Sequence, residues 1–168
     1  MRLLLALVLL YSFSSADILK DFLNKKYDEV CNYKNVLQYT RNEKVLSIIG
    51  LSCLKIDKLF VLPAVVKRLK KTSLGQKNAV YFSTIYLQKK LLLAHFFDNY
   101  PLAGFNFPKS DYVISVVFDY IKSHDYTKEG NRLLIDAGDK QYRLFKDGDK
   151  LVIDEIVDGK VVKNHWFR

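Results

Sequence analysis

The hydrophobic period of the chain changes once, near Asn131, and this change decides the fold class. Before it, apolar residues recur at helical spacing, as in "ILKDFLNKKYDEVC" (18–31) and "KNAVYFSTIYLQKKLLLAHFF" (77–97). After it come four strand-like segments, "RLLID", "KQYRLFKD", "KLVIDEIV" and "KVVKNHWF", separated by the tight-turn signals "AGD", "DGD" and "DG". We therefore expect an α+β fold: an N-terminal bundle of antiparallel helical hairpins followed by a C-terminal four-stranded antiparallel β-meander.

Three more helices are expected between and after these two. Asn42 is a suitable N-cap for a helix over "NEKVLSIIGLSCLK". Asp57 is expected to cap "KLFVLPAVVKRLKK", in which Pro63 either kinks the helix or marks its first turn. The segment "TSLGQ" is expected to break the helical pattern, and Ser110 is expected to cap "DYVISVVFDYIKSH".

The first sixteen residues have the pattern of a cleavable secretory signal. Arg2 precedes a short apolar block, and the small residues Ser14 and Ala16 stand where a signal peptidase reads. The apolar run is too short to span a bilayer. We expect a signal peptide at 1–16, a helical bundle at 17–130 and a β-meander at 131–168 packed on it as one compact domain, in a protein exported to the periplasm.

The chain contains only two cysteines, Cys31 and Cys53. Their spacing is not C-x-x-C, and the three histidines show no ligand spacing, so no metal is expected. In an exported protein, two cysteines on neighbouring helices most simply form a disulfide. The alternative is that Cys53 is a nucleophile with His95 as its base.

Positive charge is concentrated in the first part of the chain. Without residues 1–16 the net charge of the chain is +8. Residues 17–100 have a net charge of +8, and residues 101–168 have a net charge of zero. Lys outnumbers Arg by 21 to 6, which argues against phosphate-reading nucleic-acid binding. The candidate basic face is either a solvated surface or a contact for an anionic partner, membrane headgroups or cell wall; it comprises Lys67, Arg68, Lys70, Lys71, Lys89 and Lys90.

Aromatic residues gather around the Pro/Gly loop "NYPLAGFNFPK", where Tyr100, Phe105 and Phe107 stand out. Such residues either belong to the core or form an exposed patch that anchors a protein partner.

Signatures of catalysis are absent from the sequence. There is no nucleophile elbow, P-loop or H-E-x-x-H. The acidic turns lack the pattern of calcium loops, and Asp154 and Glu155 should point to opposite faces of a strand. We expect no cofactor and no enzyme, with an unrecognised hydrolase as the remaining alternative.

Two resemblances add to these expectations. Ile49-Gly50 with Cys53 is echoed 33 residues later by Phe82-Ser83 with Tyr86, so residues 42–98 are loosely similar to tetratricopeptide-like helical hairpins. In its signal and its Lys, Tyr, Phe and Asn usage, the chain resembles small uncharacterised exported proteins of AT-rich Gram-negative bacteria. Neither resemblance brings catalytic residues.

We therefore expect a non-enzymatic periplasmic adaptor that binds another envelope protein, for example as an accessory part of a flagellar motor or secretion system. The alternative is a carrier of a small apolar ligand, with a pocket between helices and sheet lined by the aromatic residues.

Overall fold

A computed structural model describes residues 15–168, and it has the expected α+β class. In the described residues, seven α-helices precede an antiparallel five-stranded meander. The expected signal peptide lies, apart from Ser15 and Ala16, outside the described residues. The chain forms two compact units, which we call the N-terminal unit (up to Gln76) and the C-terminal unit (from Lys77). The boundary falls inside a helix, so the last two helices belong with the sheet.

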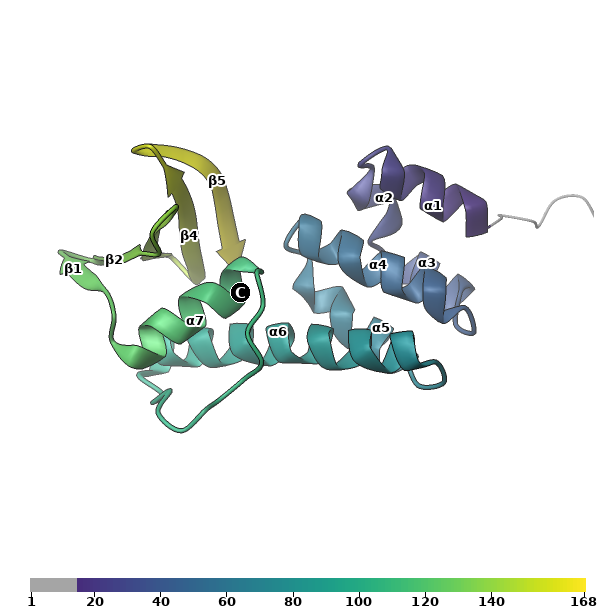
Figure 1. Cartoon of the computed structure of the whole chain (residues 1–168), viewed down its shortest axis with the longest axis horizontal. Helices are drawn as coiled ribbons and strands as arrows, with labels where there is room; N and C mark the ends of the chain where they lie inside the picture. The colour runs from purple at the N-terminus through teal and green to yellow at the C-terminus, as the bar shows by residue number, and fades with distance from the viewer. Residues whose placement is uncertain (1–14) are drawn as a thin grey trace, which may run out of the picture. The chain divides into compact units, whose positions relative to one another are not determined.

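The N-terminal unit is built around helix α4 (Glu43–Lys55). Val45, Leu46, Ile49 and Cys53 are buried along it. It packs against the surrounding short elements (Figure 1): α1 (Ser15–Leu23), α2 (Tyr27–Val30), α3 (Tyr33–Gln38), the 3-10 helix η1 (Leu59–Val61) and α5 (Leu62–Val66).

Residues 18–31, expected as one helix, form two. Lys25 adopts a φ of 60°, in the left-handed region, and this ends the first helical run before α2 begins. The hydrophobic stripe continues through the turn, so the periodicity of the sequence does not show the break.

Of the three features expected at helix starts in the N-terminal unit, two are confirmed and one is wrong. The Asn42 side chain accepts a hydrogen bond from the amide of Val45, as an N-cap should. Pro63 lies in the first turn of α5, where its missing N–H costs nothing. Asp57 caps no helix: it has a φ of 60° after the end of α4, and Lys58 precedes η1.

Helix α6 (Ser73–Asp98) begins four residues earlier than the pattern suggested. The segment "TSLGQ" therefore does not break it. Thr72 Oγ1 accepts a hydrogen bond from the amide of Gly75 and serves as the cap. Gly75 lies within the first turn, where the Glu43 side chain occupies the space that a Cβ would fill.

In the C-terminal unit, α7 (Val113–Ser123) lies against α6 and beneath the strands in Figure 1. The amide of Gln88 on α6 donates to Ser115 on α7 at 3.3 Å. Tyr112, rather than Ser110, is the N-cap residue of α7, and Ser110 Oγ instead accepts from the amide of Tyr112.

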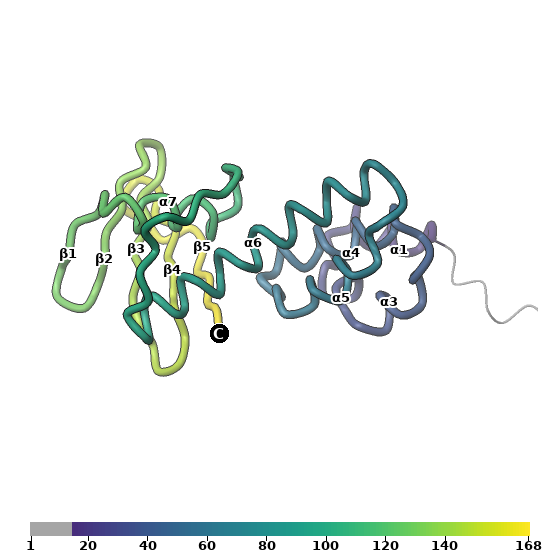
Figure 2. The backbone as a smooth tube through the Cα atoms, turned by 90° about the horizontal axis from the view of Figure 1, so that it is seen from below, coloured from purple at the N-terminus to yellow at the C-terminus, as the bar shows by residue number. Residues whose placement is uncertain are grey.

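The strands follow each other in sequence order (Figure 2). They are β1 (Thr127–Glu129), β2 (Arg132–Asp136), β3 (Gln141–Asp147), β4 (Lys150–Val157) and β5 (Lys160–Phe167). The sequence predicted four; β1 is the fifth, a short strand of exposed residues paired with β2. Between β4 and β5, Asp158 and Gly159 both have positive φ, as a two-residue hairpin turn requires.

The sheet buries one face. Side chains that alternate along the strands put Ile135, Leu144, Ile153 and Phe167 on this face, in the core of the C-terminal unit. The register of β5 shifts opposite Glu155 and Ile156, which leaves Val162 as a bulged residue without a partner on β4.

Candidate functional site

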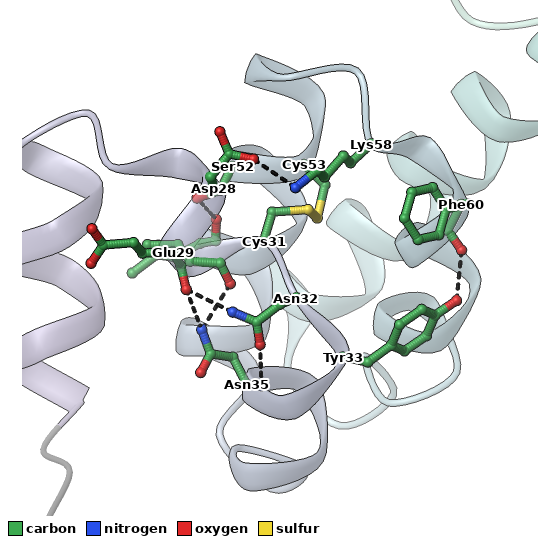
Figure 3. The surroundings of a disulfide bond; sticks show 12 residues. Asp28, Glu29, Cys31, Asn32, Tyr33, Asn35, Ser52, Cys53, Lys58 and Phe60 are labelled. Atoms are coloured by element: carbon green, nitrogen blue, oxygen red, sulfur yellow. Dashed lines mark hydrogen bonds and ion pairs between the residues drawn. A yellow bond between two sulfur atoms is a disulfide. The ribbon is translucent and has the colours of Figure 1, made fainter.

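The disulfide between Cys31 and Cys53 ties the turn between α2 and α3 to helix α4 (Figure 3). The Cα atoms are 5.0 Å apart, and both side chains are buried. This confirms the predicted staple and indicates an oxidising compartment. Because both sulfurs are bonded, Cys53 has no free thiol with which to act as a nucleophile.

Two asparagines fix the same turn (Figure 3). Asn32 Oδ1 accepts from the amide of Asn35 at 2.8 Å, which caps α3. The side-chain amides of Asn32 and Asn35 both donate to the carbonyl of Glu29, at 2.7 and 2.9 Å. The Asn35 side chain also donates to the carbonyl of Val30 at 3.0 Å, so the orientation of α3 is set by the disulfide and by four hydrogen bonds.

This fixed helix and the 3-10 helix η1 present exposed apolar side chains, which we call the α3 patch: Tyr33 and Leu37 on α3, and Phe60 on η1. Tyr33 and Leu37 are one helical turn apart on α3 and are 48% and 63% exposed. The Tyr33 hydroxyl donates to the carbonyl of Phe60 at 2.9 Å, and the two rings lie 6.2 Å apart (Figure 3). Phe60 is itself 57% exposed. The patch therefore consists of large apolar groups held in place but not covered within the described residues.

Glu43 is a buried carboxylate that joins α4 to the start of α6. It accepts hydrogen bonds from the amides of Lys70, Lys71 and Thr72 at 2.6, 2.6 and 2.7 Å, and from the Thr72 hydroxyl. The hydroxyl bond and the amide bonds outweigh the effect of burial and lower the pKa of Glu43 from 4.5 to about 2. Glu43 thus supplies negative charge where the dipole of α6 favours it.

The basic face divides between the two units. Lys67, Lys70 and Lys71 are exposed and Arg68 is half-buried, all in the N-terminal unit. Lys70 and Lys71 are the last residues of "KLFVLPAVVKRLKK", which was expected to be one helix, but α5 ends at Val66; the two lysines instead precede α6, and their amides donate to Glu43. The Glu43 carboxylate offsets the unfavourable position of these two cations.

Lys89 corrects one expectation, because it is buried and cannot belong to a solvated face. Its ammonium donates to the backbone oxygen of Arg168 and lies 5.8 Å from the centre of the Tyr86 ring. Burial, followed by the nearby charge of Lys90, lowers the pKa of Lys89 to about 8. Lys90 is exposed, in the C-terminal unit.

The aromatic loop packs on its own unit. Ring contacts lead from the exposed Tyr100 to Phe105 at 6.2 Å, to Phe107 at 6.2 Å, and to the buried Phe118 on α7 at 5.3 Å. The His95 ring nitrogen Nδ1 bonds the Tyr100 carbonyl at 2.8 Å, which closes the base of the loop. Of the three loop residues proposed as a contact, only Tyr100 is widely exposed.

Asp154 and Glu155 point to opposite faces of β4, as the strand period predicts. Arg143 donates twice to Asp154, at 3.0 and 2.6 Å, and Asn164 donates at 2.7 Å.

On the buried face, Glu155 bonds His165 at 2.9 Å and Lys140 at 3.2 Å. Burial would raise the pKa of Glu155, but the bonds to His165 and Lys140 lower it below its ordinary value.

Sequence reasoning did not find the α3 patch or the role of Glu43. Tyr33 and Phe60 are 27 residues apart, as are Glu43 and Lys70, and no local pattern joins them. Asn42 at the N-cap followed by an acidic residue was a visible signal, but it fits any helix start.

Comparison of the chain with protein families, with curated proteins and with solved structures gives no match. Among residues 15–168, no helix is both long and apolar enough to cross a membrane. The same residues contain no group of three or more His, Cys, Asp or Glu side chains placed to hold a metal ion.

Proposed function

We propose that this protein is a non-enzymatic adaptor of the periplasm that holds an acidic segment of another envelope protein on its N-terminal unit. The observation that carries the proposal is the α3 patch, with its apolar side chains exposed on a disulfide-fixed turn. Rigid aromatic side chains lose little conformational entropy on binding and are common anchors of protein interfaces.

The charge of the N-terminal unit supports an acidic partner. Residues 17–76 carry twelve Lys or Arg against six Asp or Glu, a net of +6, whereas residues 77–168 have a net of +2. Around the patch, Lys34 is exposed on α3, and α5, which leads into Lys67 and Arg68, packs against α3. Such charge speeds association with an acidic surface and makes it sensitive to salt.

The disulfide and the predicted export signal both support the periplasmic part of the proposal, because the periplasm is an oxidising compartment that exported chains reach. The alternative, a carrier of a small apolar ligand, has no comparable support, since the aromatic residues expected to line its pocket contact one another and Phe118.

The test is site-specific photocrosslinking in cells, with the crosslinking residue placed at Leu37 in the α3 patch or at Leu74 as control. Both side chains are exposed and both lie in the N-terminal unit. We expect one discrete product at Leu37 and none at Leu74. Phe60→Ser should abolish it, whereas the matched change Leu23→Ser should not.

A second arm tests the charge. Reversal of Lys67, Arg68, Lys70 and Lys71 to Glu should weaken the Leu37 crosslink at low salt and flatten its dependence on salt, because screening then has less attraction to remove. Equal products at Leu37 and Leu74, or a yield that neither Phe60→Ser nor the charge reversal changes, would reject the adaptor.

A further inference from the structure

The N-terminal unit contains a hollow of about 540 Å³ that is separate from the α3 patch. It is bounded by the end of α3, the turn into α4, and the two residues before α6. The residues that line it all have polar or charged groups, although their carbon atoms supply much of its surface: Gln38, Tyr39, Thr40, Arg41, Asn42, Glu43, Lys44, Lys71 and Thr72.

Three cations line this hollow without an ion pair. Arg41, Lys44 and Lys71 are exposed, and no carboxylate among the described residues lies within ion-pair distance of them. By contrast, Lys58 in the same unit pairs with Asp28 at 2.6 Å. Three like charges around one hollow repel each other, so an anion placed among them lowers the energy of the site.

Glu43 is the one acidic residue of the lining, and it is already satisfied. Its two oxygens face the amides of Lys70, Lys71 and Thr72 and the Thr72 hydroxyl. It therefore forms no ion pair with Arg41 or Lys44, and the ionisable side chains of the lining sum to +2 at neutral pH.

We propose that this hollow binds a phosphate-bearing ligand. A phosphate monoester carries about −1.5 to −2 charges at pH 7, which matches the lining, whereas a carboxylate carries only one. The Arg41 guanidinium offers the planar fork that binds phosphate oxygens in pairs, and Lys44 and Lys71 add point charges. The volume leaves room for an organic group beyond the phosphate, because ligand sites usually measure about 300 to 1,000 Å³.

The same chemistry has two possible sources, a soluble phosphomonoester and the headgroup of an anionic phospholipid. The proposal does not require the adaptor function: it uses neither Tyr33, Leu37 nor Phe60, shares only Lys71 with the basic face, and holds whether or not a protein partner binds the α3 patch.

The test is titration of the isotope-labelled protein with glycerol 3-phosphate, at constant ionic strength set with chloride, followed by amide NMR shifts. We expect saturable shifts at Thr40, Arg41 and Thr72. The triple variant Arg41→Gln, Lys44→Gln, Lys71→Gln should weaken the apparent affinity at least about tenfold, because all three positive charges that face the phosphate are removed. The control triple variant Lys20→Gln, Lys25→Gln, Lys55→Gln removes the same charge from exposed positions outside the hollow and should stay within about twofold.

A second arm identifies the source. Vesicles of phosphatidylcholine with phosphatidic acid should sediment the protein through the same three residues if the ligand is a lipid, and glycerol 3-phosphate should then compete. Saturable binding in solution without sedimentation identifies a soluble ligand. Shifts that grow linearly with ligand concentration would overturn the site, and so would shifts that both triple variants reduce equally. Binding of an acidic peptide, but not of glycerol 3-phosphate, to these residues would also overturn it.

Discussion

At the scale of single residues, Glu43 has the largest influence on its surroundings. Three of its four hydrogen bonds come from the backbone amides of the residues that lead into α6, and the fourth comes from the Thr72 hydroxyl. Glu43 also explains how Gly75 comes to lie inside a helix: a Cβ at that position would be 2.3 Å from Glu43 Oε2. In the sequence Gly75 looks like a helix breaker, but in the structure its lack of a side chain leaves room for the Glu43 carboxylate.

The lowered pKa of Glu43 predicts how stability depends on pH. A carboxyl with a pKa of about 2 in the folded protein and 4.5 otherwise stabilises the fold above pH 4.5, and this contribution is lost as pH falls toward 2. Glu43→Gln cannot ionise, so it should lower the melting temperature at pH 7, and the difference from wild type should shrink between pH 4.5 and 2. Thermal unfolding monitored by circular dichroism across this range measures it.

The control for that experiment is Glu29→Gln, which removes an exposed carboxylate whose ion pair with Lys26 spans 3.6 Å. It should change the melting temperature little at any pH. A constant difference between Glu43→Gln and wild type from pH 7 to 2 would contradict the role of the ionised carboxylate.

Gly75→Ala tests the space beside Glu43. Alanine normally stabilises a helix relative to glycine, by about 1 kcal/mol. Here the new methyl group must displace the bound carboxylate, so we expect Gly75→Ala to lower the free energy of unfolding. In a Glu43→Ala background most of this penalty should vanish, and denaturant unfolding of the two single variants and the double variant measures the coupling. Additive effects would mean that the carboxylate moves aside freely.

At the scale of elements, the disulfide holds together short helices that have little stability alone. Helices α2 and α3 have four and six residues, too few to persist in isolation. Cys31 lies between them and is bonded to α4, the centre of the unit. Replacing both cysteines by alanine should lower the free energy of unfolding by about 3 kcal/mol, the value expected for a loop of this length.

Urea unfolding of the oxidised protein and of the Cys31→Ala, Cys53→Ala variant measures this loss. The reduced wild type is a useful third sample, since it keeps the side-chain volume but not the crosslink. If all three unfold at the same urea concentration, the bond adds nothing to stability.

Prediction from the sequence succeeded for elements with a long hydrophobic period. It failed where contacts between residues distant in sequence determine whether an element forms or where it begins. The change of period near Asn131 correctly gave helices followed by an antiparallel meander, and the Asp-Gly turn at 158–159 gave a hairpin. Strand β1 was missed because its residues are polar and exposed and have no pattern of their own. The early start of α6 was missed because it depends on Glu43, which is remote in sequence.

At the scale of the whole molecule, the candidate sites were predicted less well than the fold. The cysteine pair was found because few explanations fit two cysteines in a chain with a predicted export signal. The basic face was read from composition, which cannot tell the buried Lys89 from the exposed Lys90. The α3 patch and the phosphate-binding hollow arise only when segments distant in sequence come together.

The proposed export predicts a defined mature chain. Cleavage after Ala16 should leave Asp17 as the first residue, because small residues stand at the positions that the peptidase reads. Asp17 then begins the shortened α1, in the first turn where an acidic residue suits the helix dipole. Intact-mass measurement of the periplasmic protein checks this, and a mass that includes residues 1–16 would contradict cleavage.

Because both sulfurs are buried, the disulfide has to form before folding of the N-terminal unit is complete. An oxidant can reach a thiol only while it is accessible, and neither Cys31 nor Cys53 is accessible once α4 is covered. The bond must therefore form while the segment between the two cysteines is still open, before the N-terminal unit is packed around α4. Oxidation that comes too late, after α4 is covered, would then leave a folded chain without its crosslink.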